Sequence, residues 1–239
     1  MTATQPRLRL GSRGSPLALA QAETVRARLQ ALHPELAESG AVEIVPVRTT
    51  GDRERQRRLA EIGGKGLFTK ELEDALLDGR LDAAVHSLKD VPTWLPDGLV
   101  LASVPERADP RDAWFSPHGG GIDHLPHGGT VGTTSLRRQA QILARRPDVR
   151  AVTFRGNLET RLRKLREGRA DATLLAQAGL ARMGMADRAT TVLDPDDVLP
   201  GVGQGALAVE TRAADARTRE LMAAAEDADA ARRVHAERA

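Results

Sequence analysis

Short apolar runs alternate with amphipathic stretches along this 239-residue chain. Ser15 followed by Pro16 indicates a helix N-cap with proline at the first helical position, and Gly79 indicates a helix end. In the first half, periodicity predicts a strand at 7–10, a helix at 17–32, a strand at 42–47, a helix at 68–77 and a buried strand at 81–88. Strands that alternate with helices predict a mostly parallel sheet.

The same order of elements returns in the second half. Residues 131–135 lead into a helix, and a strand at 149–154 precedes a helix at 157–166. The residues Gly-Arg-Leu-Asp-Ala at 79–83 recur as Gly-Arg-Ala-Asp-Ala at 168–172, each after a helix and before an apolar strand. We therefore predict an α/β protein with two lobes and a cleft between them.

Positive side chains gather where such lobes bind ligands, at the carboxyl ends of strands and the N-termini of helices. Arg137 and Arg138 stand just inside a helix N-terminus, where two cations oppose the helix dipole and require an anion. Arg13 and Arg155 lie where strands end, and Arg161 lies on the helix after Arg155. Each alone is explained as surface charge, but together they predict a polycarboxylate or phosphate ligand.

Asp90 is the candidate catalytic carboxylate, because it follows the buried strand at its carboxyl end. The alternative is a surface ion pair with Lys89. Alternation along an extended strand would place His86, Leu88 and Asp90 on one face and Lys89 on the other.

Three further motifs lack a feature that their function requires. Gly-Gly-Lys-Gly at 63–66 is not a Walker A motif, because position 59 is leucine and glycine follows Lys65. The G-x-G-x-G spacing at 201–205 lacks the third-glycine offset of a dinucleotide site and indicates a turn or hinge. The three histidines of the glycine-rich loop 116–129 have no acidic or helical framework, so we expect no metal.

Composition excludes several classes of partner. Lys and Arg total 35 against 33 Asp and Glu, and only 2% of residues are aromatic, so we expect no nucleic acid, even at the arginines of segment 53–58. No apolar window approaches the roughly 18 residues that span a bilayer, and residues 1–7 lack a signal-peptide core, so we expect a cytoplasmic protein without a membrane partner. Zero cysteines exclude disulfides and a thiol nucleophile in this chain.

Six segments carry specific motifs. They are Gly-Gly-Lys-Gly-Leu-Phe at 63–68, His-Ser-Leu-Lys-Asp-Val-Pro at 86–92, Asp-Pro-Arg-Asp-Ala at 109–113, Val-Gly-Thr-Thr-Ser-Leu-Arg-Arg-Gln at 131–139, Arg-Gly-Asn-Leu-Glu-Thr-Arg-Leu at 155–162 and Leu-Pro-Gly-Val-Gly-Gln-Gly-Ala at 199–206. With these segments the chain resembles the hydroxymethylbilane synthase (porphobilinogen deaminase) family.

The resemblance implies two periplasmic-binding-protein-like α/β lobes and a third, small α+β domain. Lobe 1 would comprise residues 1–105 plus 206–223, and lobe 2 residues 106–205. Residues 224–239 would be a stub of the C-terminal domain, its first helix only.

The resemblance also implies a transferase of tetrapyrrole (porphyrin and haem) biosynthesis. Such an enzyme joins four porphobilinogen units into hydroxymethylbilane, releases ammonia, and carries a dipyrromethane cofactor thioether-linked to a cysteine of the third domain. Asp90 would stabilise the cationic azafulvene formed when ammonia leaves, and Arg13 and Arg155 would hold substrate carboxylates as the other catalytic residues. The residues implied to bind the cofactor and growing chain are Ser15, Lys65, Phe68, Lys89, Ser135, Arg137, Arg138, Arg161, Arg182 and Gln204.

The sequence departs from the family pattern where it ends. It stops at Ala239, where the family's third domain begins, and it has no cysteine to carry the dipyrromethane. A fragment of a longer enzyme, a split enzyme and a two-lobed remnant stay open as explanations. We expect a fragment or truncated product of the enzyme, monomeric and in need of the missing domain. The alternative is a non-catalytic two-lobed binding module for acidic small molecules.

Overall fold

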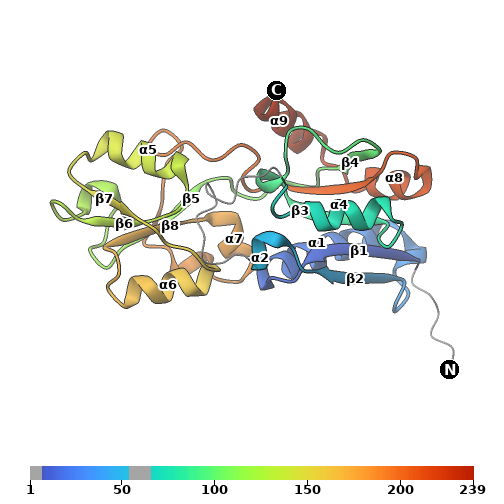
Figure 1. Cartoon of the computed structure of the whole chain (residues 1–239), viewed down its shortest axis with the longest axis horizontal. Helices are drawn as coiled ribbons and strands as arrows, with labels where there is room; N and C mark the ends of the chain where they lie inside the picture. The colour runs from blue at the N-terminus through green and yellow to red at the C-terminus, as the bar shows by residue number, and fades with distance from the viewer. Residues whose placement is uncertain (1–6, 54–65) are drawn as a thin grey trace. The chain divides into compact units, whose positions relative to one another are not determined.

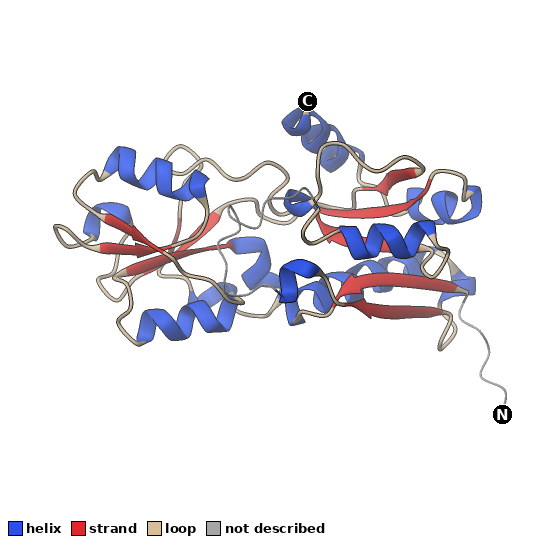
Figure 2. Cartoon of the chain, in the orientation of Figure 1, coloured by secondary structure: helices blue, strands red, loops and turns tan. Residues whose placement is uncertain are grey.

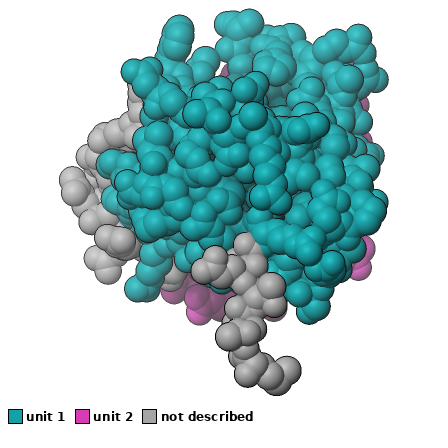
Figure 3. All heavy atoms as spheres, turned by 90° about the vertical axis from the view of Figure 1, so that its right-hand side faces the viewer, with its two compact units in different colours: residues 1–108, 206–239 teal, residues 109–205 magenta. Residues whose placement is uncertain are grey.

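The computed structural model describes residues 7–53 and 66–239. The chain divides into two compact units, unit 1 with residues 1–108 and 206–239 and unit 2 with residues 109–205 (Figures 1 and 3). Residues 224–239, which we expected to begin a third domain, belong to unit 1. There Val234 packs in a buried cluster with Leu88 and Val91.

Unit 1 contains a five-stranded sheet with flanking helices (Figure 2). Its elements are β1 (Leu8–Arg13), α1 (Pro16–Leu32), β2 (Val42–Val47), α2 (Thr50–Arg53), α4 (Lys70–Leu77), β3 (Ala83–Ser87), β4 (Leu99–Ser103), β10 (Leu207–Arg212), α8 (Ala216–Ala223) and α9 (Ala228–Arg238), with 3-10 helices at Pro34–Leu36 and Leu88–Asp90. The strand order is β2-β1-β3-β10-β4. β1 pairs in parallel with β2 and β3, whereas β10 is antiparallel to β3 and β4.

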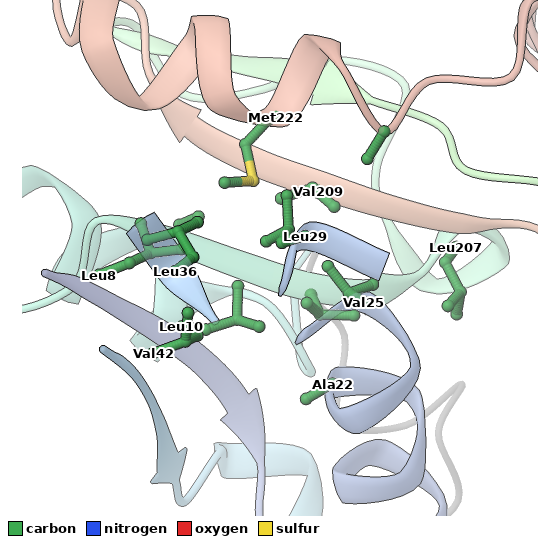
Figure 4. Packing of buried hydrophobic residues seen from close by; sticks show 13 residues of the cluster. Leu8, Leu10, Ala22, Val25, Leu29, Leu36, Val42, Leu207, Val209 and Met222 are labelled. Carbon is green, nitrogen blue, oxygen red and sulfur yellow. The ribbon is translucent and has the colours of Figure 1, made fainter. Parts of the chain in front are cut away.

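Apolar side chains on each face of this sheet explain where its helices pack. Val25 and Leu29 of α1 lie against Leu10 and Val209 of the sheet, and Met222 of α8 joins the same cluster (Figure 4). The other face is covered by α4, whose buried leucines pack on β3 and β4. Burial of each such side chain stabilises the fold by roughly 1.5–3 kcal/mol.

Unit 2 repeats this arrangement with its own elements. These are β5 (Asp112–Phe115), β6 (Thr130–Gly132), α5 (Leu136–Arg145), β7 (Arg150–Val152), α6 (Leu158–Arg166), β8 (Ala172–Ala176), α7 (Gln177–Arg182) and β9 (Thr191–Val192), with 3-10 helices at Ile122–His124 and Ala186–Arg188. The strand order is β7-β6-β8-β5-β9; β6 pairs in parallel with β7 and β8, and β5 is antiparallel to β8 and β9. In neither of the described ranges, 7–53 and 66–239, does a helix have the length and apolar character needed to cross a membrane.

The repeated five-residue motif occupies the same place in both units, which confirms the predicted duplication. Asp82 donates its backbone N–H to Arg9 O at 3.0 Å and accepts from Arg9 N at 2.7 Å. Asp171 donates to Thr130 O at 2.9 Å and accepts from Thr130 N at 2.7 Å. Each aspartate therefore forms a hook that fastens its strand to the neighbouring parallel strand, which is β1 for β3 and β6 for β8.

The end of β3 differs from the prediction of one extended strand from 81 to 88. β3 ends at Ser87, the partner of the first residue of β10, and residues Leu88–Asp90 turn as a 3-10 helix closed by the bond from Val91 N to Leu88 O. The alternation of faces stops there because the ladder with β10 stops. The expectation that His86, Leu88 and Asp90 share a strand face is therefore wrong for Asp90.

Asp171→Asn tests the contribution of this hook. The backbone and hydroxyl bonds from Thr130 lower the pKa of Asp171, so its stabilising effect is present above the unfolded pKa and is lost as pH falls through the folded one. We expect the variant to lose about 1 kcal/mol of unfolding free energy at pH 7. Urea denaturation at pH 7 and pH 3 measures this, with the exposed Asp187→Asn as control; an equal loss at both pH values would contradict the argument.

Candidate functional site

In unit 1, an arginine and an aromatic ring meet at the carboxyl end of β1. The guanidinium carbon of Arg13 lies 4.1 Å from the centre of the Phe68 ring. Phe68 in turn packs on Gly51, where a Cβ would come within 2.2 Å of the ring, and Gly51 N donates to Leu67 O at 2.9 Å. Glycine at position 51 is therefore needed for the ring to lie where it does.

Asp90 ends the 3-10 helix that follows β3, at the same edge of the sheet. Buried Leu88 anchors the helix by donating its backbone N–H to Ala206 O at 3.1 Å, and Ser87 exchanges hydrogen bonds with Gln21 of α1. The half-buried Asp90 carboxylate forms no hydrogen bond or ion pair with any residue of the described ranges. The surface pair with Lys89 is thus not formed.

Ser15 and Ser135 act as N-caps at matching positions of the two units. Ser15 Oγ accepts from Ala18 N at 3.3 Å at the start of α1, and Ser135 Oγ accepts from Arg138 N at 3.4 Å at the start of α5. These bonds fix the helix N-termini beside the strand ends. Cofactor binding by the two serines stays a prediction.

Asp112, a buried carboxylate that the sequence analysis does not single out, forms ion pairs with Arg137 and Arg138 of α5. Asp112 is fully buried on β5 and accepts two bonds from Arg138, at 2.7 and 3.1 Å, and one from Arg137 at 2.7 Å. Burial alone would raise the pKa of Asp112, but Arg138 and Arg137 outweigh it and lower the pKa. The anion that these cations require is therefore supplied by the protein itself.

Gln204 and Arg182 make internal contacts in the same unit. Gln204 is buried and donates to Asp112 Oδ1 at 2.8 Å and to Pro110 O at 2.6 Å. Arg182 donates to Gly205 O at 2.8 Å. Both bonds hold the segment that leads out of unit 2, and a further role in cofactor binding stays a prediction.

Arg155 and Arg161 are cations without a carboxylate partner among the described residues. Nη1 of Arg155 is buried and has no hydrogen-bond partner there, whereas Arg161 donates from Nε to Gly156 O at 2.9 Å. Burial, together with the nearby charges of Arg138 and Arg155, lowers the pKa of Arg161 to about 10. A cluster of like charges with this effect favours binding of an anion.

The turn that carries Arg155 depends on Gly156. Its φ of 120° lies in a region that suits glycine, and a Cβ would approach Thr160 to 2.5 Å. Asn157 Oδ1 then accepts from Thr160 N at 2.9 Å and caps α6. The two arginines are thereby placed at the start of α6, at the carboxyl end of β7.

Some predicted residues are not placed by the structure. Lys65 and the arginines at 55, 57 and 58 lie outside the described residues, and the side chain of Arg53 is also not described. Within the described ranges, no three His, Cys, Asp or Glu side chains are grouped to hold a metal. In the loop 116–129, His118 lies 3.3 Å from Asp171 and His127 lies 3.3 Å from Asp148.

The family sequence model described as "Porphobilinogen deaminase, dipyromethane cofactor binding domain" matches residues 8–220. The chain belongs to the porphobilinogen deaminase family. The family predicted from six motifs is therefore confirmed.

Individual members of the porphobilinogen deaminase family match over most of this chain. "Porphobilinogen deaminase, chloroplastic" of Oryza sativa subsp. japonica is 57% identical over 208 residues, which is 87% of this chain and 58% of the rice protein. "Porphobilinogen deaminase" of Paracoccus denitrificans is 55% identical over 232 residues, 97% of this chain and 74% of that protein. The chain thus spans between about half and three quarters of these relatives.

Solved structures of the periplasmic-binding type share the fold. A putative methionine-binding lipoprotein from Bacillus subtilis has a TM-score of 0.52 at 13% identity, covering 93% of this chain and 91% of the lipoprotein. A YaeC-family lipoprotein from Enterococcus faecalis has a TM-score of 0.51 at 14% identity, covering 97% and 96%. This likeness confirms the predicted two-lobed α/β class and concerns the fold alone.

Asp112→Asn tests the buried ion pair. Without the carboxylate charge, Arg138 stays buried and uncompensated, so we expect the unfolding free energy to fall by about 3 kcal/mol or more. Because the folded pKa of Asp112 is lowered, its contribution disappears as pH falls through that pKa. Fluorescence of Trp114, buried on the same strand, follows unfolding of unit 2. The exposed pair of Asp123 with Arg145 supplies the control Asp123→Asn, expected to cost about 1 kcal/mol at most.

Arg161→Met tests whether the site stores unfavourable charge. A base whose pKa is lowered in the folded state destabilises that state while it is charged at neutral pH. Removing the Arg161 charge should therefore raise the thermal unfolding midpoint of the ligand-free chain. Differential scanning calorimetry measures this against Arg163→Met, an exposed position on the same helix. A lower midpoint for Arg161→Met alone would show that the cluster is not strained.

Proposed function

We propose that this chain supplies the substrate-binding and proton-transfer residues of a porphobilinogen deaminase, which joins four porphobilinogen units into hydroxymethylbilane and releases ammonia. The observation that carries the proposal is the pair Arg155 and Arg161, cations without a carboxylate partner in the described residues. Porphobilinogen bears acetate and propionate groups. A growing chain of pyrroles therefore needs fixed cations of this kind.

Asp90 is proposed as the catalytic group. Its carboxylate is not neutralised by a described residue, so it is available to accept hydrogen bonds from pyrrole N–H groups. A fixed negative charge there stabilises the cation that forms when the C–N bond to ammonia breaks, and the carboxylate then accepts a proton as the ring regains aromaticity. The anchored turn after β3 keeps this carboxylate in place.

Arg13 and Phe68 are proposed to position the substrate beside Asp90. The guanidinium offers a cation for a carboxylate, and the ring offers an apolar face against which a pyrrole packs. Their mutual contact at 4.1 Å reduces the freedom of both side chains before substrate binds.

The dipyrromethane cofactor of the family fits part of this chain. Arg155 and Arg161 are suited to its carboxylates, whereas the sequence holds no cysteine to form its thioether. When bound, the cofactor supplies the pyrrole chain that is extended. The same proposal includes cofactor binding by the other predicted residues, among them Ser15, Lys89 and Ser135. It also includes a monomeric state, which light scattering measures, and a cytoplasmic location, which cell fractionation measures.

Asp90→Asn tests the function directly. Porphobilinogen consumption and ammonia release are measured for the chain alone and with the remaining segment of the Paracoccus denitrificans relative added as a separate polypeptide. We expect kcat to fall by about 10²–10⁴-fold with KM changed little, as for loss of a general acid–base group.

The exposed Asp97→Asn, in the loop after the same turn, is the control and should leave turnover unchanged. If porphobilinogen binds with unchanged affinity but neither mixture turns it over, the chain is a binding module and the catalytic proposal is wrong.

A further inference from the structure

Three ionisable side chains are buried together in unit 1, away from the residues assigned above. Glu73 of α4 is 6% exposed, His86 of β3 is 5% exposed and Glu210 of β10 is fully buried. Buried charged groups are costly unless they are paired, so such a cluster calls for an explanation.

The register of the sheet brings two of these residues together. His86 is the partner of Ala208, and Glu210 is the partner of Ala84, so both side chains leave the same face as diagonal neighbours. Nε2 of His86 lies 2.9 Å from Oε2 of Glu210. The imidazole is thus in close contact with a carboxylate from the neighbouring antiparallel strand. This approach lacks the geometry of a hydrogen bond, since neither Nε2 of His86 nor a carboxylate oxygen of Glu210 has a hydrogen-bond partner among the described residues.

Glu73 approaches this pair from the helix that covers that face. Burial raises the pKa of Glu73, the neighbouring Thr69 side chain opposes the shift, and the charge of Glu210 adds to it. A negative charge on Glu73 is therefore less favourable here than in solvent. The two carboxyl groups and the imidazole are buried in the same layer, between the sheet and α4.

The positions of these residues along the chain connect the cluster to the site. His86 precedes Asp90 by one short turn, and Glu73 follows Phe68 by one helical turn. β10 lies between β3 and β4 in the sheet. The cluster therefore connects β3 and α4 close to the points where these elements adjoin the turn that carries Asp90 and the segment that carries Phe68.

Stability alone does not account for such a cluster. Apolar side chains of similar volume in place of a buried ion pair are often neutral or stabilising, whereas the polar pair permits only one geometry. The leucines of α4 already bury an apolar face on this sheet. Geometric precision is the property that the charged groups add.

We propose that Glu73, His86 and Glu210 form a positioning network that holds the Asp90 turn and the Phe68 segment in fixed register. The network touches neither substrate nor cofactor and acts through β3 and α4. The consequence for turnover rests on the proposed function, whereas the structural part does not.

Hydrogen exchange followed by mass spectrometry tests the structural part without any substrate. Glu210→Gln removes the carboxylate charge beside His86, so amides of segments 66–73 and 86–91 should exchange about tenfold faster, the equivalent of about 1.4 kcal/mol of local opening. Segment 216–238 of the same unit should stay within about twofold of the wild type. Equal acceleration in all three segments, or none in the first two, would overturn the proposal.

The third member of the network is tested by a pair of substitutions. Glu73→Gln keeps the size and polar groups of the side chain without its charge and should retain slow exchange, whereas Glu73→Ala should loosen segment 66–73. Asp74→Asn, exposed at the next position of α4, is the matched control and should change neither segment. If Glu210→Gln does not fold, Glu210→Asp is used instead, because the shorter side chain keeps the charge but moves it away from His86. Faster hydrogen exchange in segments 66–73 and 86–91 is again the expected result, and unchanged exchange would overturn the proposal.

Turnover of the same variants separates positioning from general stability. Glu210→Gln should lower kcat about tenfold at nearly constant KM, and Glu73→Gln should resemble the wild type. A wild type without turnover would contradict the proposed function, yet the exchange pattern would still support or overturn the network. Equal losses in kcat for Glu73→Gln and Glu73→Ala would also contradict it.

Discussion

The buried carboxylate of Asp112 decides how positive charge is distributed in unit 2. It forms ion pairs with Arg137 and Arg138, two cations that the helix dipole disfavours at the start of α5. It also accepts a hydrogen bond from Gln204. Asp112 thus compensates part of the positive charge of α5, whereas Arg155 and Arg161, near the start of α6, have no carboxylate partner among the described residues. Under the proposed function, the anion-binding character of unit 2 comes from these two arginines.

Unit 1 separates its carboxylates in a comparable way. Glu210 is fully buried and has an imidazole at 2.9 Å, whereas Asp90 stands half-buried on a short turn without a charge partner among the described residues. Glu210 lies inside the sheet, whereas Asp90 lies beyond the strands and, under the proposed function, is the catalytic group. The separation follows from position, since β3 ends before Asp90 and places it beyond the ladder.

Local signals were sufficient for much of the fold and only part of the site. The repeat of Gly-Arg-x-Asp-Ala predicted the duplication because both copies perform the same backbone hook. Periodicity predicts a strand that continues to Asp90, because the pattern carries no information on where the distant partner strand β10 begins. Asp112 was missed for a related reason: pairing across 25 residues depends on tertiary structure. Its position at the head of the apolar run Ala-Trp-Phe was the available signal.

The antiparallel strand β10 has a consequence for how the chain is made. Unit 2 is continuous in sequence, and the bond from Gln204 to Pro110 joins positions one residue inside its two ends. Unit 1 instead lacks a strand of its own sheet until residues 207–212 have left the ribosome. During synthesis from the N-terminus, unit 2 can thus fold before unit 1 is complete. Until β10 is synthesised, β3 and β4 of unit 1 lack the strand that lies between them, and their edges are exposed.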